Sequence, residues 1–201
     1  MRPENPKNKK DILKLAIPLF ARGGYNGVSM RQIAKKVGIN AASLYYHFPD
    51  KQTLYIEAVK QAFLTKELDL SKTLTIKASA HKKLHIFIER LCRFFKDEPD
   101  FRALVQREML DGDEARLQLL ATHIFKNFFE TVTSLSKELS PDRDPHLLAV
   151  SIFALVAYHY QTASIRLYLP GAKPDHNDPE VVSKHVTSLL LQGIENKDQN
   201  G

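Results

Sequence analysis

The side chains best suited to contact a nucleic acid gather in one stretch, SMRQIAKKVGINAASLYYHFPDK, which covers residues 29–51. Arg31 carries a guanidinium group that can make a bidentate contact to guanine or clamp a phosphate. Ser43, Tyr46 and His47 offer short hydrogen-bond donors that suit phosphate oxygens. The chemistry of this stretch is therefore recognition of an anionic polymer, provided that the chain holds these groups on one surface.

Two short helices joined by a tight turn are predicted to position them. Ser29 is an N-cap type of residue, and Gly38 follows the apolar Val37 at the point where a left-handed residue can end a helix. Asn40 then provides an N-cap for a second helix over residues 41–47. This is helix-turn-helix geometry, in which the N-terminal part of the second helix enters the major groove of DNA.

A third helix is predicted over residues 11–22, and Gly23 and Gly24 end it. Ahead of it, residues 1–10 form a polar, basic arm that we expect to be disordered without DNA. Residues 1–51 hold ten Lys and Arg against three Asp and Glu, a net charge of +7, whereas the remainder holds nineteen against twenty, a net charge of −1. The positive charge thus lies on the segment with the helix-turn-helix, as expected if phosphates are its partner.

The same segment resembles the TetR family of bacterial transcriptional regulators. The residues that carry the resemblance are Ile33-Ala34, Gly38, Leu44-Tyr45-Tyr46-His47-Phe48 and Lys51. The resemblance implies that the DNA-facing residues are Ser29, Arg31, Ala41, Ala42, Ser43, Tyr45, Tyr46, His47 and Lys51, although the ring of Tyr45 can instead belong partly to the core. Lys51 would add its charge at a helix N-terminus, which already favours anions.

The resemblance also implies an all-α fold in two domains. An N-terminal three-helix helix-turn-helix DNA-binding domain would span residues 1–51. A C-terminal helical domain for ligand binding and dimerisation would span residues 52–201, beginning with a connecting helix over about residues 51–70. From Ser79 onward the sequence itself predicts helices throughout, with no period-two strand pattern.

The predicted helices of the C-terminal part are separated by Pro, Gly and Asp residues. They are His81–Lys96, Phe101–Leu110, Glu114–Leu139, a long helix opened by Asp144-Pro145 that can continue to Leu169, and a last helix opened by Asp178-Pro179 that runs to about Glu195. In the family, the last two helices pair with their copies to form a homodimer. The residues expected to supply buried contacts are Ala149, Ile152, Phe153, Val156, Tyr160, Val182, Val186, Leu189, Leu190 and Gly193, unless these stripes are only intramolecular core.

An unusually aromatic set of residues occupies the middle of the chain. Composition and family together suggest a pocket for a small apolar or aromatic effector of unknown identity. The candidate ligand-binding residues are Phe87, Leu91, Phe94, Phe101, Met109, His123, Phe125, Asn127, Phe128, Phe153, Tyr158 and His159. The alternative for each of these residues is plain core.

Other kinds of chemistry find little support. His81 and His85 are spaced to chelate on one helix face, but no carboxylate or Cys stands nearby in sequence as a third ligand, so we expect surface histidines and no metal site. Cys92 in an apolar helix is expected to be a small buried residue. We expect no cofactor and no catalytic site, because no GxGxxG, P-loop, HExxH or GxSxG motif occurs. No apolar run approaches eighteen residues and no signal-peptide pattern is seen, so a cytoplasmic protein without membrane contact is expected.

The resulting hypothesis is a homodimeric regulator that binds a palindromic operator in double-stranded DNA and most often represses transcription. An effector in the C-terminal domain would change the separation of the two recognition helices. Two alternatives stay open. One is a DNA-bound scaffold that recruits a protein partner without a small molecule, and the other is an enzyme that uses the aromatic cavity with His123 or His159.

Overall fold

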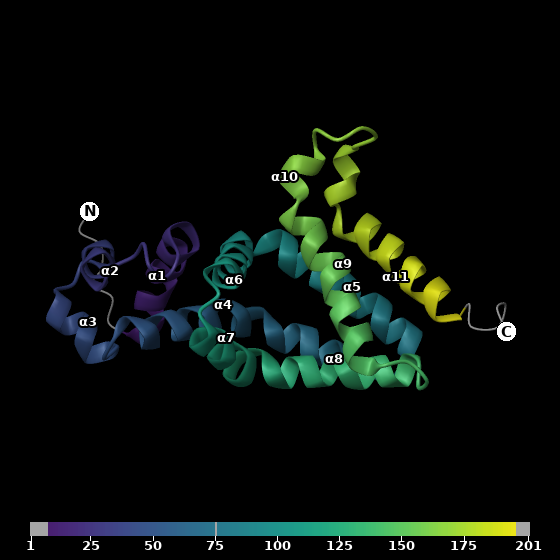
Figure 1. Ribbon diagram of the computed structural model, residues 1–201, viewed down its shortest axis with the longest axis horizontal. Helices are drawn as coiled ribbons and strands as arrows, with labels where there is room; N and C mark the ends of the chain where they lie inside the picture. Colours follow the sequence, from purple (N-terminus) through teal and green to yellow (C-terminus); the bar gives the residue numbers. More distant parts are fainter. Residues whose placement is uncertain (1–7, 75, 196–201) are drawn as a thin grey trace. The chain divides into compact units, whose positions relative to one another are not determined.

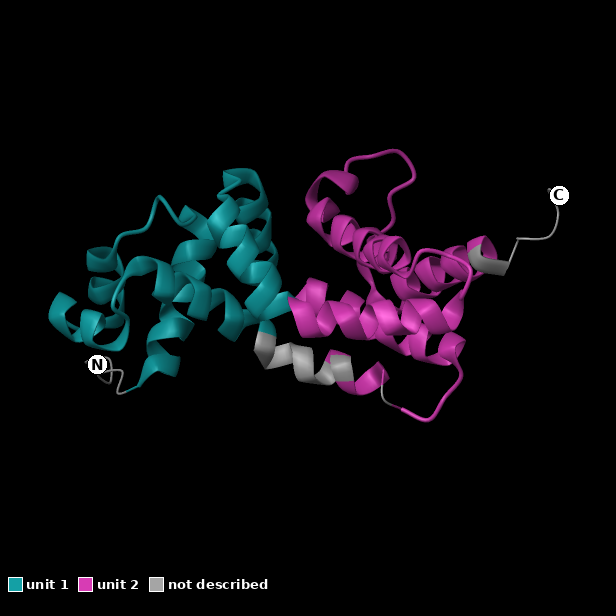
Figure 2. Ribbon diagram, turned by 60° about the horizontal axis from the view of Figure 1, so that its bottom comes forward, with its two compact units in different colours: residues 1–65, 99–125 teal, residues 66–98, 126–201 magenta. Residues whose placement is uncertain are grey.

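The computed structural model of the chain is helical, and it describes residues 8–74 and 76–195, without the side chains of residues 64–69, 71, 194 and 195. The described helices form two compact units, which Figure 2 shows in different colours. Unit 1 comprises residues 1–65 and 99–125, and unit 2 comprises residues 66–98 and 126–201. The described residues contain no β-strand, so the expected all-α fold is confirmed.

Unit 1 contains the helices that carry the predicted DNA-binding residues (Figure 1). Its elements are α1 (Lys9–Gly23), α2 (Met30–Val37), α3 (Ala41–His47), the first part of α4 (Lys51–Leu74), α6 (Pro99–Asp111), α7 (Glu114–Leu120) and the π-helix η1 (Ala121–Phe125). Helix α1 packs against both α2 and α6. Fully buried apolar side chains from four helices, including Phe20, Ile33, Leu44 and Leu54, form the core that holds α1 to α4 together.

Unit 2 is built from the last part of α4, α5 (Ala80–Asp97), α8 (Lys126–Leu139), α9 (Pro145–Gln161), the short α10 (Ala163–Arg166), the 3₁₀-helix η2 (Pro174–Asn177) and α11 (Pro179–Glu195). Helix α5 packs against α8, α9 and α11. Its buried face includes Phe87, Ile88 and Leu91, and opposing residues such as Val156 and Val186 are buried as well. The core of unit 2 therefore lies around α5.

The division into units differs from the expected boundary after Lys51. Helices α6 and α7 belong by their contacts to the unit that contains the helix-turn-helix, because α1 packs on α6 and α6 on α7. The division by function, with residues 1–51 for DNA and 52–201 for ligand and dimer, stays a prediction. A basic arm is expected over residues 1–10. Residues 1–7 of it lie outside the described residues, and Lys9 and Lys10 already belong to α1.

One predicted helix ends earlier than expected, and another contains an irregular turn. The long helix opened by Pro145 ends at Gln161 and does not continue to Leu169. Thr162 is the C-cap, with a φ of −93° and a ψ of 5°, which lie outside the α-helical region. Beyond it, Nη2 of Arg166 donates to the carbonyl oxygen of His159 at 2.8 Å and so satisfies one of the last carbonyl groups of the helix. The helix predicted over residues 114–139 is helical throughout, but it contains the π-helical turn η1 between α7 and α8.

Candidate DNA-binding surface and C-terminal unit

Local hydrogen bonds define both helices of the helix-turn-helix. At the start of α2, the Gln32 backbone N–H donates to the Ser29 hydroxyl at 3.3 Å and the Gln32 side chain accepts from the Ser29 backbone N–H at 2.7 Å, which is a capping box. Gly38 ends α2 with a φ of 82°, a left-handed conformation that favours glycine. Asn40 caps α3 by accepting from the Ser43 backbone N–H at 2.7 Å. The predicted caps and turn are all confirmed.

The second helix turns one face inward and leaves the other open to solvent. Leu44 is fully buried against α2, together with Ile33 and Val37 of that helix. The DNA-facing residues predicted from the resemblance fall into two exposure groups. Ser29, Arg31, Ala42, Tyr45 and Tyr46 are exposed, and Ala41, Ser43, His47 and Lys51 are partly exposed. None of the nine is buried, and Tyr46 has the largest exposed fraction among the tyrosines of α3, 88%.

Tyr45 is 50% exposed, so its ring is not enclosed in the core. The ring of Tyr46 lies edge-on to the imidazole of His47, with 5.5 Å between the centroids. The side chains of Tyr45 and Tyr46, each with a polar hydroxyl group, and the partly exposed Ser43 therefore lie on the solvent-facing side of the seven-residue helix α3. Such groups can donate to phosphates, while Ala42 is small enough to let the helix approach a groove.

Lys51 lies at the first residue of α4 and is already engaged within the chain. Its ammonium group donates to the carbonyl oxygen of Tyr25 at 3.0 Å and lies 4.3 Å from the centroid of the Tyr25 ring. Tyr25 belongs to the connection between α1 and α2, which the sequence analysis did not single out. The signal that could have identified it is its position within the Gly23-Gly24-Tyr25-Asn26-Gly27 segment, where several glycines allow a tight loop.

Further basic groups lie near the recognition helix and were counted in the sequence analysis only as charge. Lys35 and Lys36 are exposed in the last turn of α2. The ammonium group of Lys9, in the first turn of α1, lies 5.4 Å from the ring centroid of Phe48, the C-cap of α3. These three lysines add positive charge to α1 and α2, two helices of unit 1.

The structure distributes the twelve predicted ligand-binding residues between the two units. In unit 2, Phe87, Phe128 and Phe153 form one cluster with centroid separations of 5.5–6.3 Å, and Phe129 stacks on Phe153 at 5.9 Å. In unit 1, Phe101 and Phe125 pack with Phe63 at 5.7 and 5.1 Å. Leu91 and Phe94 are buried in α5. Each unit therefore contains an aromatic cluster that includes predicted ligand-binding residues.

The remaining candidates lie at the surface or are engaged elsewhere. Met109 is 70% exposed and Tyr158 is 67% exposed, and His123 and Asn127 are exposed as well. The partly buried His159 has its Nε2 2.7 Å from the carbonyl oxygen of His176, and burial lowers the pKa of this imidazole. His123 belongs to unit 1 and His159 to unit 2, so these two histidines of the enzyme alternative do not share a unit.

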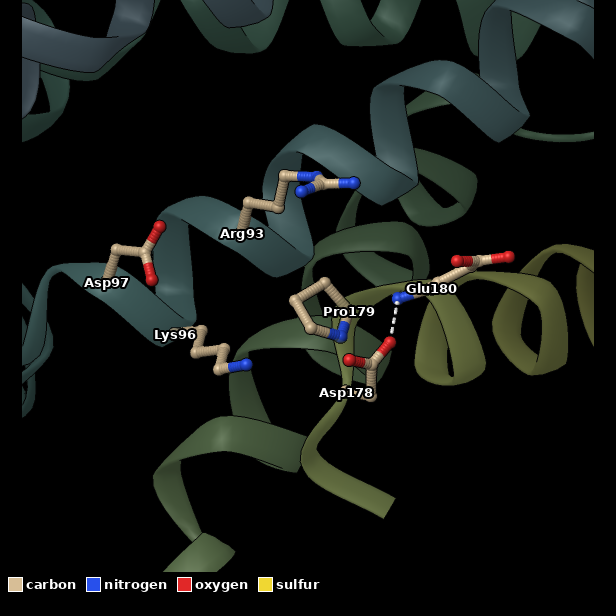
Figure 3. Close-up of a pocket in the computed structure, with 6 residues that line it drawn as sticks. All are labelled: Arg93, Lys96, Asp97, Asp178, Pro179 and Glu180. Carbon is tan, nitrogen blue, oxygen red and sulfur yellow. Dashed lines mark hydrogen bonds between the residues drawn. The ribbon is translucent and has the colours of Figure 1, made fainter. Parts of the chain in front are cut away.

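A cavity of about 260 Å³ opens between the end of α5 and the start of α11 (Figure 3). Its lining residues are Arg93, Lys96, Asp97, Asp178, Pro179 and Glu180. Asp178 accepts a hydrogen bond from the Glu180 backbone N–H at 2.9 Å and so serves the start of α11. Five of the six residues are charged, and none belongs to the predicted ligand-binding set.

Helices α9 and α11 each have one buried and one exposed face. Seven of the ten residues expected at a dimer interface are buried within the single chain, so for them the alternative of intramolecular core is correct. These seven are Ala149, Ile152, Val156, Tyr160, Val182, Val186 and Leu190. The opposite faces expose large apolar side chains, namely Leu147, Val150 and Tyr158 on α9 and Val181 and Leu189 on α11.

Three further expectations concern the histidines, the cysteine and the membrane. His81 is exposed, and Nδ1 of His85 lies 3.4 Å from the Thr187 hydroxyl; within the described part of the chain, no group of three His, Cys, Asp or Glu is arranged to hold a metal ion. Cys92 is fully buried, as expected. Among residues 8–74 and 76–195, no helix has the length and apolar character that crossing a membrane requires.

Comparisons with known proteins agree with this arrangement. The family model "Bacterial regulatory proteins, tetR family" matches residues 12–58. Over 55 residues the chain is 47% identical to the negative transcriptional regulator IcaR of the biofilm operon icaADBC of Staphylococcus aureus (strain Newman). The match covers 27% of this chain and only 30% of IcaR.

Two solved structures share the fold over nearly the whole chain. The transcriptional regulator FadR from Bacillus subtilis, in complex with stearoyl-CoA, superposes with a TM-score of 0.77 at 20% identity, covering 93% of this chain and 100% of FadR. AibR, in complex with isovaleryl coenzyme A and operator DNA, has a TM-score of 0.69 at 19% identity, covering 91% of this chain and 97% of AibR. Over residues 12–58 the chain is therefore similar to the bacterial regulatory proteins of the tetR family, in agreement with the resemblance seen in residues 33–51.

Proposed function

We propose that the protein is a homodimeric, ligand-responsive transcriptional repressor that binds a palindromic operator. The observation that carries the proposal is the exposed face of α3, where Ala42, Tyr45 and Tyr46 stand open on a helix capped at Asn40. Arg31 is exposed at the start of the preceding helix. The net charge of +7 over residues 1–51 supports DNA as the partner, because phosphate neutralisation provides much of the affinity of such proteins.

Dimerisation is supported by the exposed faces of α9 and α11. Helix α9 exposes Leu147 and Tyr158, and α11 exposes Leu189. Exposed apolar side chains of this kind favour a surface that another protein molecule covers. A twofold symmetric dimer places two recognition helices about 34 Å apart, or a multiple of that distance, so that both enter successive major grooves. The operator would then be an inverted repeat.

The effector is proposed to be a small apolar or aromatic molecule that binds near the aromatic cluster of unit 2. Phe129 and Phe153 in this cluster are only partly buried, so they retain apolar surface that a ligand can cover. The acyl-CoA complexes of FadR and AibR make acyl-CoA esters suitable first probes. An effector releases DNA only to the extent that it prefers the conformation with low DNA affinity.

Selection of DNA fragments from the source genome tests the central claim. The purified protein is incubated with fragmented genomic DNA at near-physiological salt, and the retained fragments are sequenced. We expect one inverted repeat to be enriched, and a variant with both Arg31→Ala and Tyr46→Ala to lose that enrichment. If the retained fragments share no sequence, the protein binds DNA only by electrostatic attraction, and the proposal is overturned.

The repressor and effector parts are tested on the selected operator. A reporter gene placed downstream of this operator should be transcribed less when the protein is present. Stearoyl-CoA and isovaleryl-CoA are then titrated into the protein–operator complex, and release of DNA is followed by fluorescence anisotropy. If neither probe nor a panel of aromatic acids changes DNA affinity, the scaffold alternative replaces the ligand-responsive one.

A further inference from the structure

The connection between α1 and α2 is packed tightly around Tyr25. A Cβ atom added to Gly27 would lie 2.3 Å from the carbonyl oxygen of Gly23, so the two ends of the loop approach too closely for a larger residue. Gly24 has a φ of 70°, which favours glycine. The path of the loop therefore requires glycine at these two positions, and it places the carbonyl group and the ring of Tyr25 against Lys51.

Two cations from different helices lie over the ring of Tyr25. The ammonium group of Lys51 is 4.3 Å from its centroid, and Cζ of Arg116, from α7, is 4.2 Å from it. The ring of Tyr55 meets that of Tyr25 edge-on, with centroids 5.2 Å apart and an interplanar angle of 74°. The Tyr25 ring is therefore fixed by α4 and α7 together, and all four residues belong to unit 1.

Arg116 is itself held by acidic side chains. Its side chain is almost fully buried, its Nε donates to Oε1 of Glu108 at 2.8 Å, and its Nη1 lies 3.1 Å from Oδ2 of Asp113. A guanidinium with these partners cannot leave the ring without breaking a buried ion pair. Lys51 has no comparable acidic partner in the described contacts; its ammonium group is oriented by the Tyr25 carbonyl oxygen and ring.

We propose that Tyr25 is a positioning residue for DNA binding, which holds the ammonium group of Lys51 ready for a backbone phosphate. The inference rests on the proposed function. A free lysine has a flexible four-carbon stem whose freedom is lost when it contacts a phosphate. Tyr25 restricts that freedom beforehand and uses only part of the donor capacity of the ammonium group, which has three N–H bonds.

A double-mutant cycle on the full-length protein tests this role. Tyr25→Leu removes the ring and keeps the backbone carbonyl, and Lys51→Gln removes the charge. With Lys51 present, Tyr25→Leu should weaken operator binding about two- to fivefold, the effect of one moderately exposed cation–π contact, and should make binding less salt-dependent. In the Lys51→Gln background the same change should have no further effect. Tyr25→Phe, which keeps the ring, is the matched control and should bind like the wild type.

A purely structural role for Tyr25 predicts a different result for this double-mutant cycle. Tyr25→Leu would then weaken binding by the same factor in both backgrounds, and that result would overturn the inference. Thermal unfolding of each variant is measured alongside, so that a loss of folded protein is not mistaken for a loss of DNA contact.

Lysine acylation provides a readout that needs no DNA. Under limiting acylating reagent, mass spectrometry should find Lys51 modified more slowly than the exposed Lys35, and Tyr25→Leu should raise the rate at Lys51 several-fold without changing that at Lys35. An unchanged rate at Lys51 overturns the inference whether or not DNA binds. A wild-type protein that selects no operator overturns the proposed function instead, so the two failures are distinguishable.

Discussion

Nε of Arg116 donates to Oε1 of Glu108 across 2.8 Å, and both side chains are almost fully buried in unit 1. The second carboxylate oxygen of Glu108, Oε2, has no hydrogen-bond partner among the described residues. A buried charge without its counter-ion is strongly unfavourable, whereas an apolar pair of similar volume is often tolerated. The pair therefore makes a specific prediction about stability.

Arg116→Ala should lower the free energy of unfolding by about 3–5 kcal/mol, because it leaves Glu108 charged and buried without its partner. Glu108→Leu combined with Arg116→Met should destabilise the protein much less. Urea titration followed by circular dichroism measures both values. Lys184→Ala, which breaks the exposed pair between Lys184 and Glu180, is the control and should leave the urea midpoint nearly unchanged, because solvent screens this pair. A double variant as unstable as Arg116→Ala would contradict the argument.

Two substitutions of Asn40 separate the effect of the N-cap of α3 from the effect of a charge at the same position. Asn40→Ala removes the acceptor for the Ser43 backbone N–H, so it should cost about 1 kcal/mol of stability and weaken operator binding. Asn40→Asp keeps the cap and introduces a negative charge beside the proposed DNA surface. It should retain stability and still weaken binding, most strongly at low salt. Equal binding by Asn40→Asp and wild type would argue against DNA contact at this end of α3.

The variant Arg31→Ala shows whether the guanidinium group of Arg31 recognises a base or binds a phosphate. If its guanidinium contacts a guanine, Arg31→Ala should cost about 1–3 kcal/mol on the operator and relax preference at one base pair. Anisotropy titrations on operators changed one base pair at a time provide the measurement. Equal losses on all sequences would make Arg31 a phosphate clamp. Lys35→Ala, at an exposed position of the same helix, should reduce affinity without changing sequence preference.

The proposed dimer depends on the exposed faces of α9 and α11. Val150→Asp or Leu189→Asp introduces a charge into this apolar surface, and each should shift the protein from dimer to monomer in sedimentation analysis while its helix content stays unchanged. Leu110→Asp is the control, because Leu110 is exposed in α6 of unit 1 and lies outside these faces. Dimers that persist in both α9 and α11 variants would place the interface elsewhere.

The buried thiol should be unreactive. Burial raises the pKa of Cys92 to about 12, although the nearby Tyr160 hydroxyl opposes the shift. At pH 8 almost no thiolate, the reactive form, is present. An aromatic disulfide reagent should therefore modify native protein very slowly, and one thiol per chain rapidly in denaturant. Rapid modification of the native protein would show that Cys92 becomes accessible.

The sequence alone was sufficient to predict the features that depend on neighbours within four residues. The Ser29 and Asn40 caps, the left-handed Gly38 and the start of α9 at Pro145 after Asp144 are all of this kind, and all are observed. The helix-turn-helix and the resemblance to the TetR family followed from the same short stretch, because its pattern is local and specific. The domain boundary, the effector pocket and the DNA contacts of individual residues stay predictions.

Tertiary structure decided which face of each helix is buried and which distant residues meet. Helices α9 and α11 are apolar on more than one face, so periodicity could not show that Ile152 and Val156 belong to the intramolecular core while Tyr158 is exposed. Aromatic residues far apart in the sequence meet within each unit, as Phe87 does with Phe153 in unit 2 and Phe63 with Phe125 in unit 1. The contact of Tyr25 with Lys51 and Arg116 joins residues 26 and 91 positions apart in the chain, and such contacts depend on packing that no local pattern encodes.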